Sequence, residues 1–432
     1  MSTVTDRPAT TTPDAVVRPE APRSWKTPIV LAVLSLTVII GFGILGDPGQ
    51  VSFAWSDPED PIVLAPFVVT SSVYCLVVGV IALLATGAST WLIAMRRKIP
   101  FWIPLIVGFA FLSSLLAWVG AGAPSQRVPV VFLLTGAIAL SAAVIYGALA
   151  GVIGERVGVT NIAIEGQLLA GAFCGAFVGS ISGSQFVGLI AAMIAGCLVS
   201  AVLAVFSINF LVDQIIVGVV INVIIIGLTD FLYSAILADN EPELNRPGTL
   251  PFLPIPGLSD IPVLGPVLFD HRITTYLIFV LVPVVWFFLF RTRAGLRIRA
   301  LGEYPLAADT VGINVLRTRF WTVTLAGAIA GLGGAALTLG SNNAFVPGMS
   351  AGQGYIALAA VILGRWNPWL AAIAGLLFGF ARNFRIWAVG AGSPIPPDLI
   401  AMTPYLVTLF AVAVLIGKAV APAAVAKPYI KG

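Results

Sequence analysis

The chain has 432 residues, of which 59% are hydrophobic and 10% are charged, and its mean hydropathy is +1.02. A soluble domain carries about 25% charged residues, and burial in one core saturates at a few hundred residues, so this composition excludes a soluble globular protein. Residues 291–319 hold six arginines against two acidic residues, and this net of +4 equals the net charge of the whole chain. The basic excess therefore fits a loop beside an anionic leaflet, and we expect no nucleic-acid partner.

Residues 1–27 are rich in Thr and Pro and predict a disordered tail. Apolar stretches then recur that are long enough to cross a hydrocarbon core of about 30 Å. They predict an all-α, polytopic membrane protein with 10 to 12 transmembrane helices, beginning with an uncleaved span from Pro28 to Gly46. The stretch 354–364 is too short to span alone and predicts a re-entrant or broken helix. The candidate stretches are 28–46, 66–94, 101–121, 129–153, 162–181, 185–207, 214–237, 273–290, 320–340, 354–364, 369–388 and 400–417.

The distribution of Lys and Arg sets the expected orientation, because cytoplasmic loops are enriched in these residues. Basic residues follow the second span, crowd the segment 291–319 and close the chain, whereas the loops 47–62 and 238–272 are acidic. Both termini are therefore predicted to be cytoplasmic and both acidic loops to lie outside. The Pro-rich loop 238–272 predicts a stiff, extended segment, which is either a plain connector or a surface that receives an external partner.

The cysteines and the single histidine, His271, lie far apart and in no metal-ligand spacing. We therefore expect no metal site and no Cys/His nucleophile. We also expect no cofactor on this chain.

The segment Gly302–Gly312 is predicted to form a short cytoplasmic helix. Pro305 suits a first helical position, and Gly312 is placed to end the helix. A helix of barely two turns is unstable alone in water, so it must be braced by neighbouring spans, by a partner, or by both. The alternative is a surface helix that only reverses the chain.

Two further segments combine polar residues with spans. In Gly158–Gly166, Asn161 and Glu165 share one helix face, and an ionisable group at membrane depth usually faces a polar pathway or a partner. The alternative is that Glu165 lies at the interface and pairs with Arg156. The second segment, 364–368, interrupts two apolar helices. Interrupted segments in two halves of a chain point to a transport site, although a short surface hairpin is the alternative.

These segments resemble the permeases of the branched-chain amino acid, ribose and nucleoside group of ABC importers. GVTNIAIEG (158–166) is similar to the Asn-Ile-Gly-x-Glu-Gly signature of the group, with Ala163 in place of Gly. LGEYPLAADTVGINVLRTRF (301–320) resembles its coupling loop, although Leu306 stands where that loop is acidic. ALAAVILGRWNPWLAAIAGLLFGFARN (357–383) looks most like the nucleoside and simple-sugar branch. The resemblance covers roughly residues 130–417.

The resemblance implies a type II-like ABC importer permease fold with two related halves. It divides the chain into a tail (1–27), additional N-terminal helices (28–125), a permease core (126–418) with its coupling loop (291–319), and a C-terminal tail (419–432). It implies a bacterial plasma-membrane subunit that imports nucleosides and is not itself an enzyme. The partners implied are cytoplasmic ABC ATPase subunits that carry ATP and Mg, a second permease subunit in a homodimer or heterodimer, an extracytoplasmic substrate-binding lipoprotein, and the bilayer.

The resemblance and the polarity of the spans supply two sets of candidate residues. The residues expected to couple to the ATPase are Gly302, Glu303, Pro305, Leu306, Ala307, Ala308 and Gly312. The candidate substrate pathway consists of Asn161, Glu165, Asn222, Asn342, Asn343, Phe345 and Tyr355. Other functions remain open: the same machinery importing a sugar or polyol, an ion-coupled secondary transporter using Glu165 or Asp230, or a membrane enzyme acting on lipid.

Overall fold

The computed structural model describes residues 25–56, 62–392, 396–402 and 420–430. The predicted tail 1–27 and the predicted span 400–417 fall almost wholly outside these ranges. Ten helical segments of the described chain are long and apolar enough to cross a membrane. The polytopic, mainly helical architecture is therefore confirmed, with a number of spans inside the expected range.

Several of these spans continue from an α-helix into a short π-helical stretch (η). The ten are Lys26–Ile44 (α1 with η1), Ser71–Ala94 (α2), Trp102–Gly122 (α3), Val130–Arg156 (α4), Ile164–Ser182 (α5), Gln185–Asn209 (α6 with η2), Gln214–Leu237 (α7 with η3), Ile273–Arg291 (α9), Val315–Asn342 (α12 with η5) and Pro368–Gly390 (α14). The shorter helices are Glu241–Leu244 (α8), Gly265–Phe269 (η4), Arg293–Glu303 (α10), Pro305–Thr310 (α11), Gln353–Leu363 (α13) and Pro397–Ala401 (α15).

Among the residues that the structure describes, five short strands depart from the all-helical prediction. Gln50–Ala54 (β1) pairs antiparallel with Phe67–Thr70 (β2) and parallel with Arg127–Pro129 (β3), so the second span begins at Ser71 and not at residue 66. Phe252–Pro254 (β4) pairs with Asp270–Arg272 (β5), which folds the loop 238–272 back on itself. The prediction of an extended segment was wrong here. Strands of three residues are too short to show a periodic pattern in the sequence.

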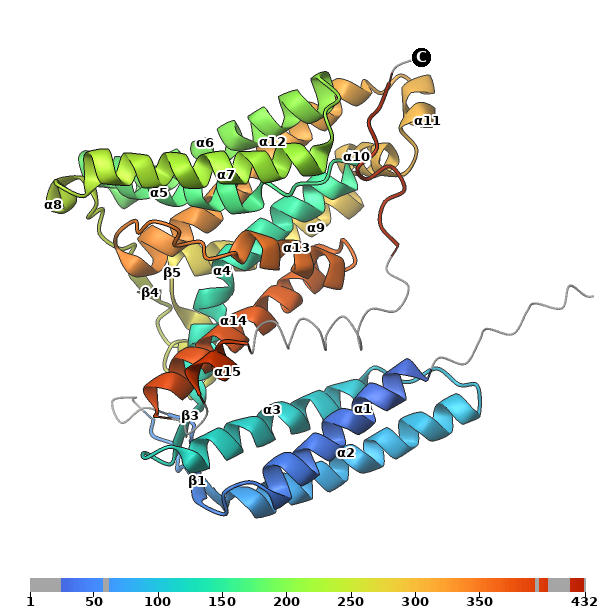
Figure 1. The fold of residues 1–432 in the computed structure, drawn as a ribbon, viewed down its shortest axis with the longest axis vertical. Helices are drawn as coiled ribbons and strands as arrows, with labels where there is room; N and C mark the ends of the chain where they lie inside the picture. Colours follow the sequence, from blue (N-terminus) through green and yellow to red (C-terminus); the bar gives the residue numbers. More distant parts are fainter. Residues whose placement is uncertain (1–24, 57–61, 393–395, 403–419, 431–432) are drawn as a thin grey trace, which may run out of the picture.

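The N-terminal helices form a three-helix group beside the rest of the bundle (Figure 1). Side chains hold this group together, as in the stacking of Phe42 on Trp118 with ring centroids 5.1 Å apart. A cluster of buried apolar residues connects the three-helix group to α14 through Phe384 and Trp387. The three-stranded sheet ties the same group to the start of α4.

The centre of the molecule packs backbone against backbone. Helices α5, α6 and α12 touch through glycines, and a Cβ at Gly331 would collide with the carbonyl oxygen of Ala192. A Cβ at Gly171 would lie 2.5 Å from the carbonyl oxygen of Gly331. Small residues permit such close helix approach in membranes. The small-residue run Ala326–Ala336 lies in α12 at these contacts and permits this close packing.

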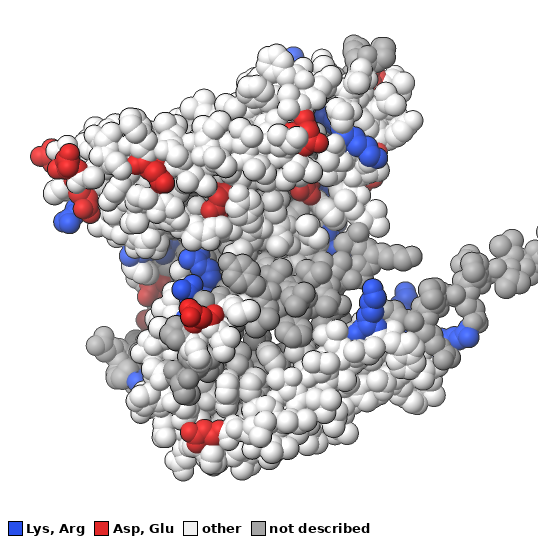
Figure 2. Space-filling view, viewed as in Figure 1, with Lys and Arg blue, Asp and Glu red and all other residues white. Residues whose placement is uncertain are grey.

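Charged side chains are sparse along the helices and gather at the ends of the bundle. Figure 2 shows that most of the surface along α1–α3 and α5–α7 is uncharged, with acidic side chains gathered around α8. Helices α10 and α11 and the described C-terminal segment lie together at the opposite end from α8 (Figure 1).

Candidate functional site

Glu165 lies at the start of α5, and its carboxylate receives the beginning of the short helix α13. One oxygen accepts hydrogen bonds from the Ser350 hydroxyl at 2.6 Å and the Gly352 N–H at 2.8 Å, and the other accepts from the Gly354 N–H at 2.6 Å. The first N–H groups of a helix have no partner within the helix, and the helix dipole favours a negative charge there. Glu165 therefore satisfies the start of a helix that begins inside the bundle.

This contact depends on the absence of a side chain at Gly354. A Cβ at this position would collide with the backbone nitrogen of Glu165. Gly352 has a φ of +79°, a conformation that side chains disfavour. The Gly-x-Gly sequence at residues 352–354 thus lets α13 approach α5 closely enough for the carboxylate to reach its N–H groups.

A network of buried amides fixes the chain between α4 and α5. Asn161 and Gln167 exchange two hydrogen bonds of 3.1 Å, and Gln167 also donates to Ser200 on α6. Asn222 on α7 accepts from the Gly166 N–H at 2.8 Å and donates to the Ile162 carbonyl at 2.9 Å. Buried polar groups are expensive unless they are paired, so this network holds the start of α5 in one position.

The other end of α13 is held by the end of α4. The turn Gly364–Asn367 contains Arg365 and Trp366 with φ of +51° and +54°, which is unusual for residues other than glycine. The Trp366 indole donates to the Glu155 carboxylate, and its carbonyl accepts from Arg156 at 3.0 Å. The turn is therefore held to the end of α4 through both the side chain and the carbonyl group of Trp366.

The two interrupted segments of the sequence are therefore neighbours. Residues 155–165 contact both ends of α13, with Glu165 at its start and Glu155 and Arg156 just after its end. The alternative pairing of Glu165 with Arg156 is not what the structure shows. Arg156 instead bonds Trp366 and lies 5.3 Å from the centre of the Phe290 ring.

The remaining pathway candidates divide into two groups. Tyr355 joins the cluster, because its hydroxyl accepts from Asn222 at 3.2 Å while its ring is 47% exposed. Asn342 and Asn343 lie exposed at the end of the α12 span. Phe345 is fully buried against Phe173 and offers no open face for stacking a base. Whether any of these side chains contacts substrate stays a prediction.

The coupling candidates lie together at the end of α10, in α11 and just after it, where Gly302 and Ala308 are buried and the others are at least partly exposed. Pro305 opens α11, Ala308 is buried beneath it, and Gly312 follows with a φ of +85°. The outward face carries Leu306 (51% exposed) and Val311 (74% exposed). The six-residue helix and the residue after it therefore present two apolar side chains outward.

The glycine and glutamate that precede this helix connect it to the bundle. A Cβ at Gly302 would collide with the Arg156 carbonyl oxygen, so the end of α10 touches the end of α4. Glu303 accepts a hydrogen bond of 3.4 Å from the Ala423 N–H. The coupling loop is therefore packed on α4 and on the C-terminal segment.

Arg319, which sequence reasoning did not single out, lies buried where these segments meet. Its guanidinium donates to the carbonyls of Val157 at 3.1 Å, Leu301 at 3.4 Å and Lys427 at 3.3 Å. The hydropathy pattern could not identify this role, because Arg317, two residues earlier, has the same side chain and is exposed.

The start of α13, by contrast, has a local signal in the sequence. Ser350-Ala-Gly-Gln-Gly stands before an apolar run, which is typical of a helix start.

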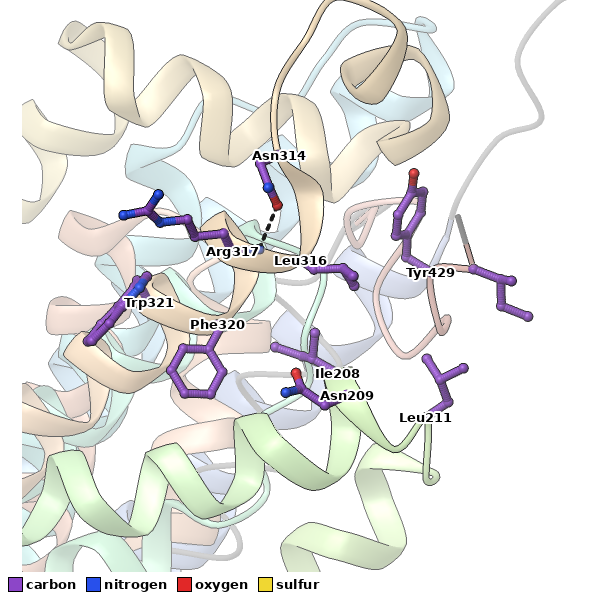
Figure 3. Close-up of a pocket in the computed structure, with 10 residues that line it drawn as sticks. Ile208, Asn209, Leu211, Asn314, Leu316, Arg317, Phe320, Trp321 and Tyr429 are labelled. Carbon is purple, nitrogen blue, oxygen red and sulfur yellow. Dashed lines mark hydrogen bonds between the residues drawn. The ribbon is translucent and has the colours of Figure 1, made fainter. Parts of the chain in front are cut away.

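A cavity of about 660 Å³ opens beside this junction (Figure 3). It lies between the end of the α6 span, the first turns of α12 and the C-terminal residues. Asn314 caps α12 by accepting from the Arg317 N–H at 3.0 Å. The lining residues are Ile208, Asn209, Leu211, Asn314, Leu316, Arg317, Phe320, Trp321, Tyr429 and Ile430.

Within the described ranges, no group of three or more His, Cys, Asp or Glu side chains is placed to hold a metal ion. Glu155 and Glu165 are buried and engaged in the hydrogen bonds described above. Both carboxylates therefore accept hydrogen bonds next to the ends of α13, Glu165 at its start and Glu155 just after its end.

In the described part of the chain, ten helices apolar enough to cross a membrane and a shorter helix that starts inside the bundle define a multi-pass membrane protein. The chain matches the family described as "Branched-chain amino acid transport system / permease component" over residues 130–418. The chain therefore belongs to this permease family, whose members work with ATPase and substrate-binding subunits.

Characterised relatives agree with this assignment. The guanosine ABC transporter permease NupQ of Bacillus subtilis is 40% identical over 317 residues, which covers 69% of this chain and 97% of the relative. The nucleoside ABC transporter permease NupC of Lactococcus lactis is 42% identical over 182 residues, covering 41% of this chain and 57% of the relative. A putative glucose ABC transporter permease of Haloferax volcanii, TsgC13, is 31% identical over 271 residues, covering 62% and 80%. No solved structure matches the chain.

Proposed function

We propose that this chain is the permease subunit of an ATP-driven importer that carries nucleosides across the bacterial plasma membrane. The observation that carries the proposal is the 40% identity to a guanosine permease along nearly the whole of that relative. The nucleoside permease of Lactococcus lactis adds support at 42% identity.

The proposed orientation places α10, α11 and the chain ends in the cytoplasm. Six arginines between residues 291 and 319 support it, because basic residues concentrate on the cytoplasmic side. The acidic α8 and the β4–β5 hairpin then face outward, where a substrate-binding lipoprotein delivers its ligand. A second permease subunit completes the membrane assembly.

In the proposed mechanism this chain carries out no covalent step. ATP and Mg belong to a partner ATPase, which contacts the outward face of α11. Movement of α11 reaches the spans through Gly302 against α4 and through Arg319 in α12. A rigid connection of this kind is what transmits a partner's motion to a bundle.

The test is nucleoside uptake in the host from which this gene is deleted. Labelled uridine, adenosine and guanosine are compared with ribose, inositol and leucine. Loss of nucleoside uptake alone, restored by the intact gene but not together with an ATPase whose Walker lysine is replaced, is the expected result. Uptake that survives with the inactive ATPase contradicts an ATP-driven mechanism, and collapse with a protonophore at constant ATP then indicates ion coupling.

A sugar or polyol is the second candidate substrate, favoured by the 31% identity to a putative glucose permease. Competition separates the two: adenosine but not ribose displaces labelled uridine if the base is recognised, and both displace it if the sugar alone is recognised. Loss of sugar uptake with unchanged nucleoside uptake would show that the substrate is a sugar, and the permease assignment would still hold.

A further inference from the structure

The last described residues, Val420–Ile430, lie packed against the coupling loop. Pro422, Ala424 and Tyr429 are buried, while the residues between them are mostly exposed. The Ala424 N–H donates to the Gly302 carbonyl at 2.8 Å. The segment is therefore attached to the end of α10, immediately before α11 begins.

Further contacts fasten the same segment on two more sides. The Ala423 N–H donates to the Glu303 carboxylate at 3.4 Å, and the Lys427 carbonyl accepts from buried Arg319 at 3.3 Å. Tyr429 lies beside Asp309 of α11 and the first residues of α12, with which it lines a cavity of about 390 Å³. Figure 3 shows its ring next to Leu316 and Asn314.

Arg319 joins the C-terminal segment to the ends of α4 and α10. Its guanidinium bonds a carbonyl at the end of α4, another at the end of α10 and a third in the C-terminal segment. These residues are up to 270 positions apart in the sequence, counted from Val157 to Lys427. A buried charge is expensive unless its hydrogen bonds are made, so displacement of the C-terminal segment leaves one of these donors without its acceptor.

We propose that Val420–Ile430 is a positioning strap that holds the coupling helix α11 in a fixed place relative to the ends of α4 and α12. Helix α11 has six residues and cannot be stable alone in water. The strap braces its Asp309 flank and leaves the outward face with Leu306 and Val311 free for the ATPase. This inference rests on the proposed function, because the partner of α11 is the ATPase of that importer.

The test compares two truncations of the full chain in its complex. One ends before Val420 and removes the strap. The matched control ends after Ile430 and removes only the last two residues. Each is purified with its partner permease and ATPase, and amide hydrogen exchange is measured over residues 304–313.

We expect removal of the strap to raise amide exchange in α11 by about tenfold or more, because local opening becomes easier. Substrate carried per ATP hydrolysed should also fall, because α11 is no longer held where the ATPase contacts it. The control truncation should match the intact chain in both measurements. Exchange and coupling ratio unchanged by removal of the strap would overturn the proposal.

A substitution covers the case in which the truncated chain does not reach the membrane. Ala424→Pro removes the N–H that bonds Gly302, and Ala421→Pro, at an exposed position, is its matched control. Faster exchange in α11 for Ala424→Pro alone supports the strap, and equal exchange for both variants contradicts it.

The two proposals fail in different ways. If the intact complex carries no nucleoside but exchange in α11 still rises on removal of the strap, the proposed substrate is wrong and the strap stands. If the intact complex carries nucleosides and removal of the strap changes neither measurement, the strap is wrong and the proposed function stands.

Discussion

The spans at the centre of the molecule and those of the N-terminal group are all apolar enough to cross a membrane but are built differently. Over an 18-residue apolar stretch of each span, 72% of the residues are buried in α5 and in the α12 span, against 33% in α2. In the centre, glycines bring backbones into contact, whereas in the N-terminal group aromatic and aliphatic side chains fill the space. The family match also begins only at residue 130. The comparison teaches that hydropathy indicates whether a helix lies in the membrane, while small residues indicate how closely it packs against its neighbours.

The largest effect is expected where backbone touches backbone. Gly331→Val places a side chain against the backbone of Ala192 and Met193, which cannot move aside as a flexible side chain can. Overpacking costs about 1–3 kcal/mol where the surroundings can shift, and we expect a larger cost here because the two helix backbones must separate. We expect the folded chain to be largely lost, measured by size-exclusion chromatography of a fluorescent fusion. The control is Gly108→Val in α3, where a Cβ has no heavy atom within 4 Å. Equal yields of the two variants would contradict the comparison.

The next largest effect is expected at the start of α13. Glu165→Ala leaves two backbone N–H groups and the Ser350 hydroxyl without their acceptor, and each unsatisfied group costs about 1–3 kcal/mol. Uptake should fall to background. Glu165→Gln keeps one acceptor oxygen and should retain intermediate uptake. Full activity of Glu165→Ala would show that α13 does not need this cap.

A smaller effect is expected at the turn after α13. Trp366→Phe removes the indole donor to Glu155 and leaves a buried carboxylate with one partner fewer. We expect a loss of about 1–3 kcal/mol in the free energy of unfolding, read as a lower midpoint in thermal unfolding. Trp369→Phe, at a residue that is 46% exposed, is the matched control. The turn is not held by this contact if both variants unfold at the same temperature.

The smallest effect is expected in the N-terminal group. Trp118→Leu removes the stacking with Phe42, and an aromatic pair contributes about 0.5–1.5 kcal/mol beyond its buried area. The thermal midpoint should fall slightly while uptake per folded molecule stays the same. A large loss of uptake would mean that this group takes part in transport and would remove the contrast drawn above.

Much of the architecture could be predicted from the sequence, because lipid makes hydropathy decisive. The spans, the short helix near residues 354–364 and the helix that Pro305 opens all follow from local patterns. The sequence also supplied Asn161, Glu165, Asn222 and Tyr355 as pathway candidates, because polar residues inside spans must find partners. The predicted shared helix face of Asn161 and Glu165 was wrong, since α5 begins only at Ile164 and Asn161 lies in the segment before it.

Other features depend on contacts between distant residues and left no local signal. The parallel pairing of β1 with β3 joins residues more than 70 positions apart. The burial of Phe345 depends on Asn245, whose side chain bonds both backbone groups of Phe345. The packed segment Val420–Ile430 resembles a free tail in composition, because its contacts are made largely through backbone groups.

The Arg319 junction has a consequence for mutational tolerance. Its three acceptors are main-chain carbonyls, so the side chains at Val157, Leu301 and Lys427 take no part in the bonds. A saturation scan would record Arg319 as intolerant while exposed Lys427 accepts nearly any residue other than proline. Pairwise covariation would be equally silent, because no side chain has to change in step with the arginine. Hydrogen bonds of this kind can therefore be kept while the residues that supply the acceptors change, and only the arginine shows the constraint in the sequence.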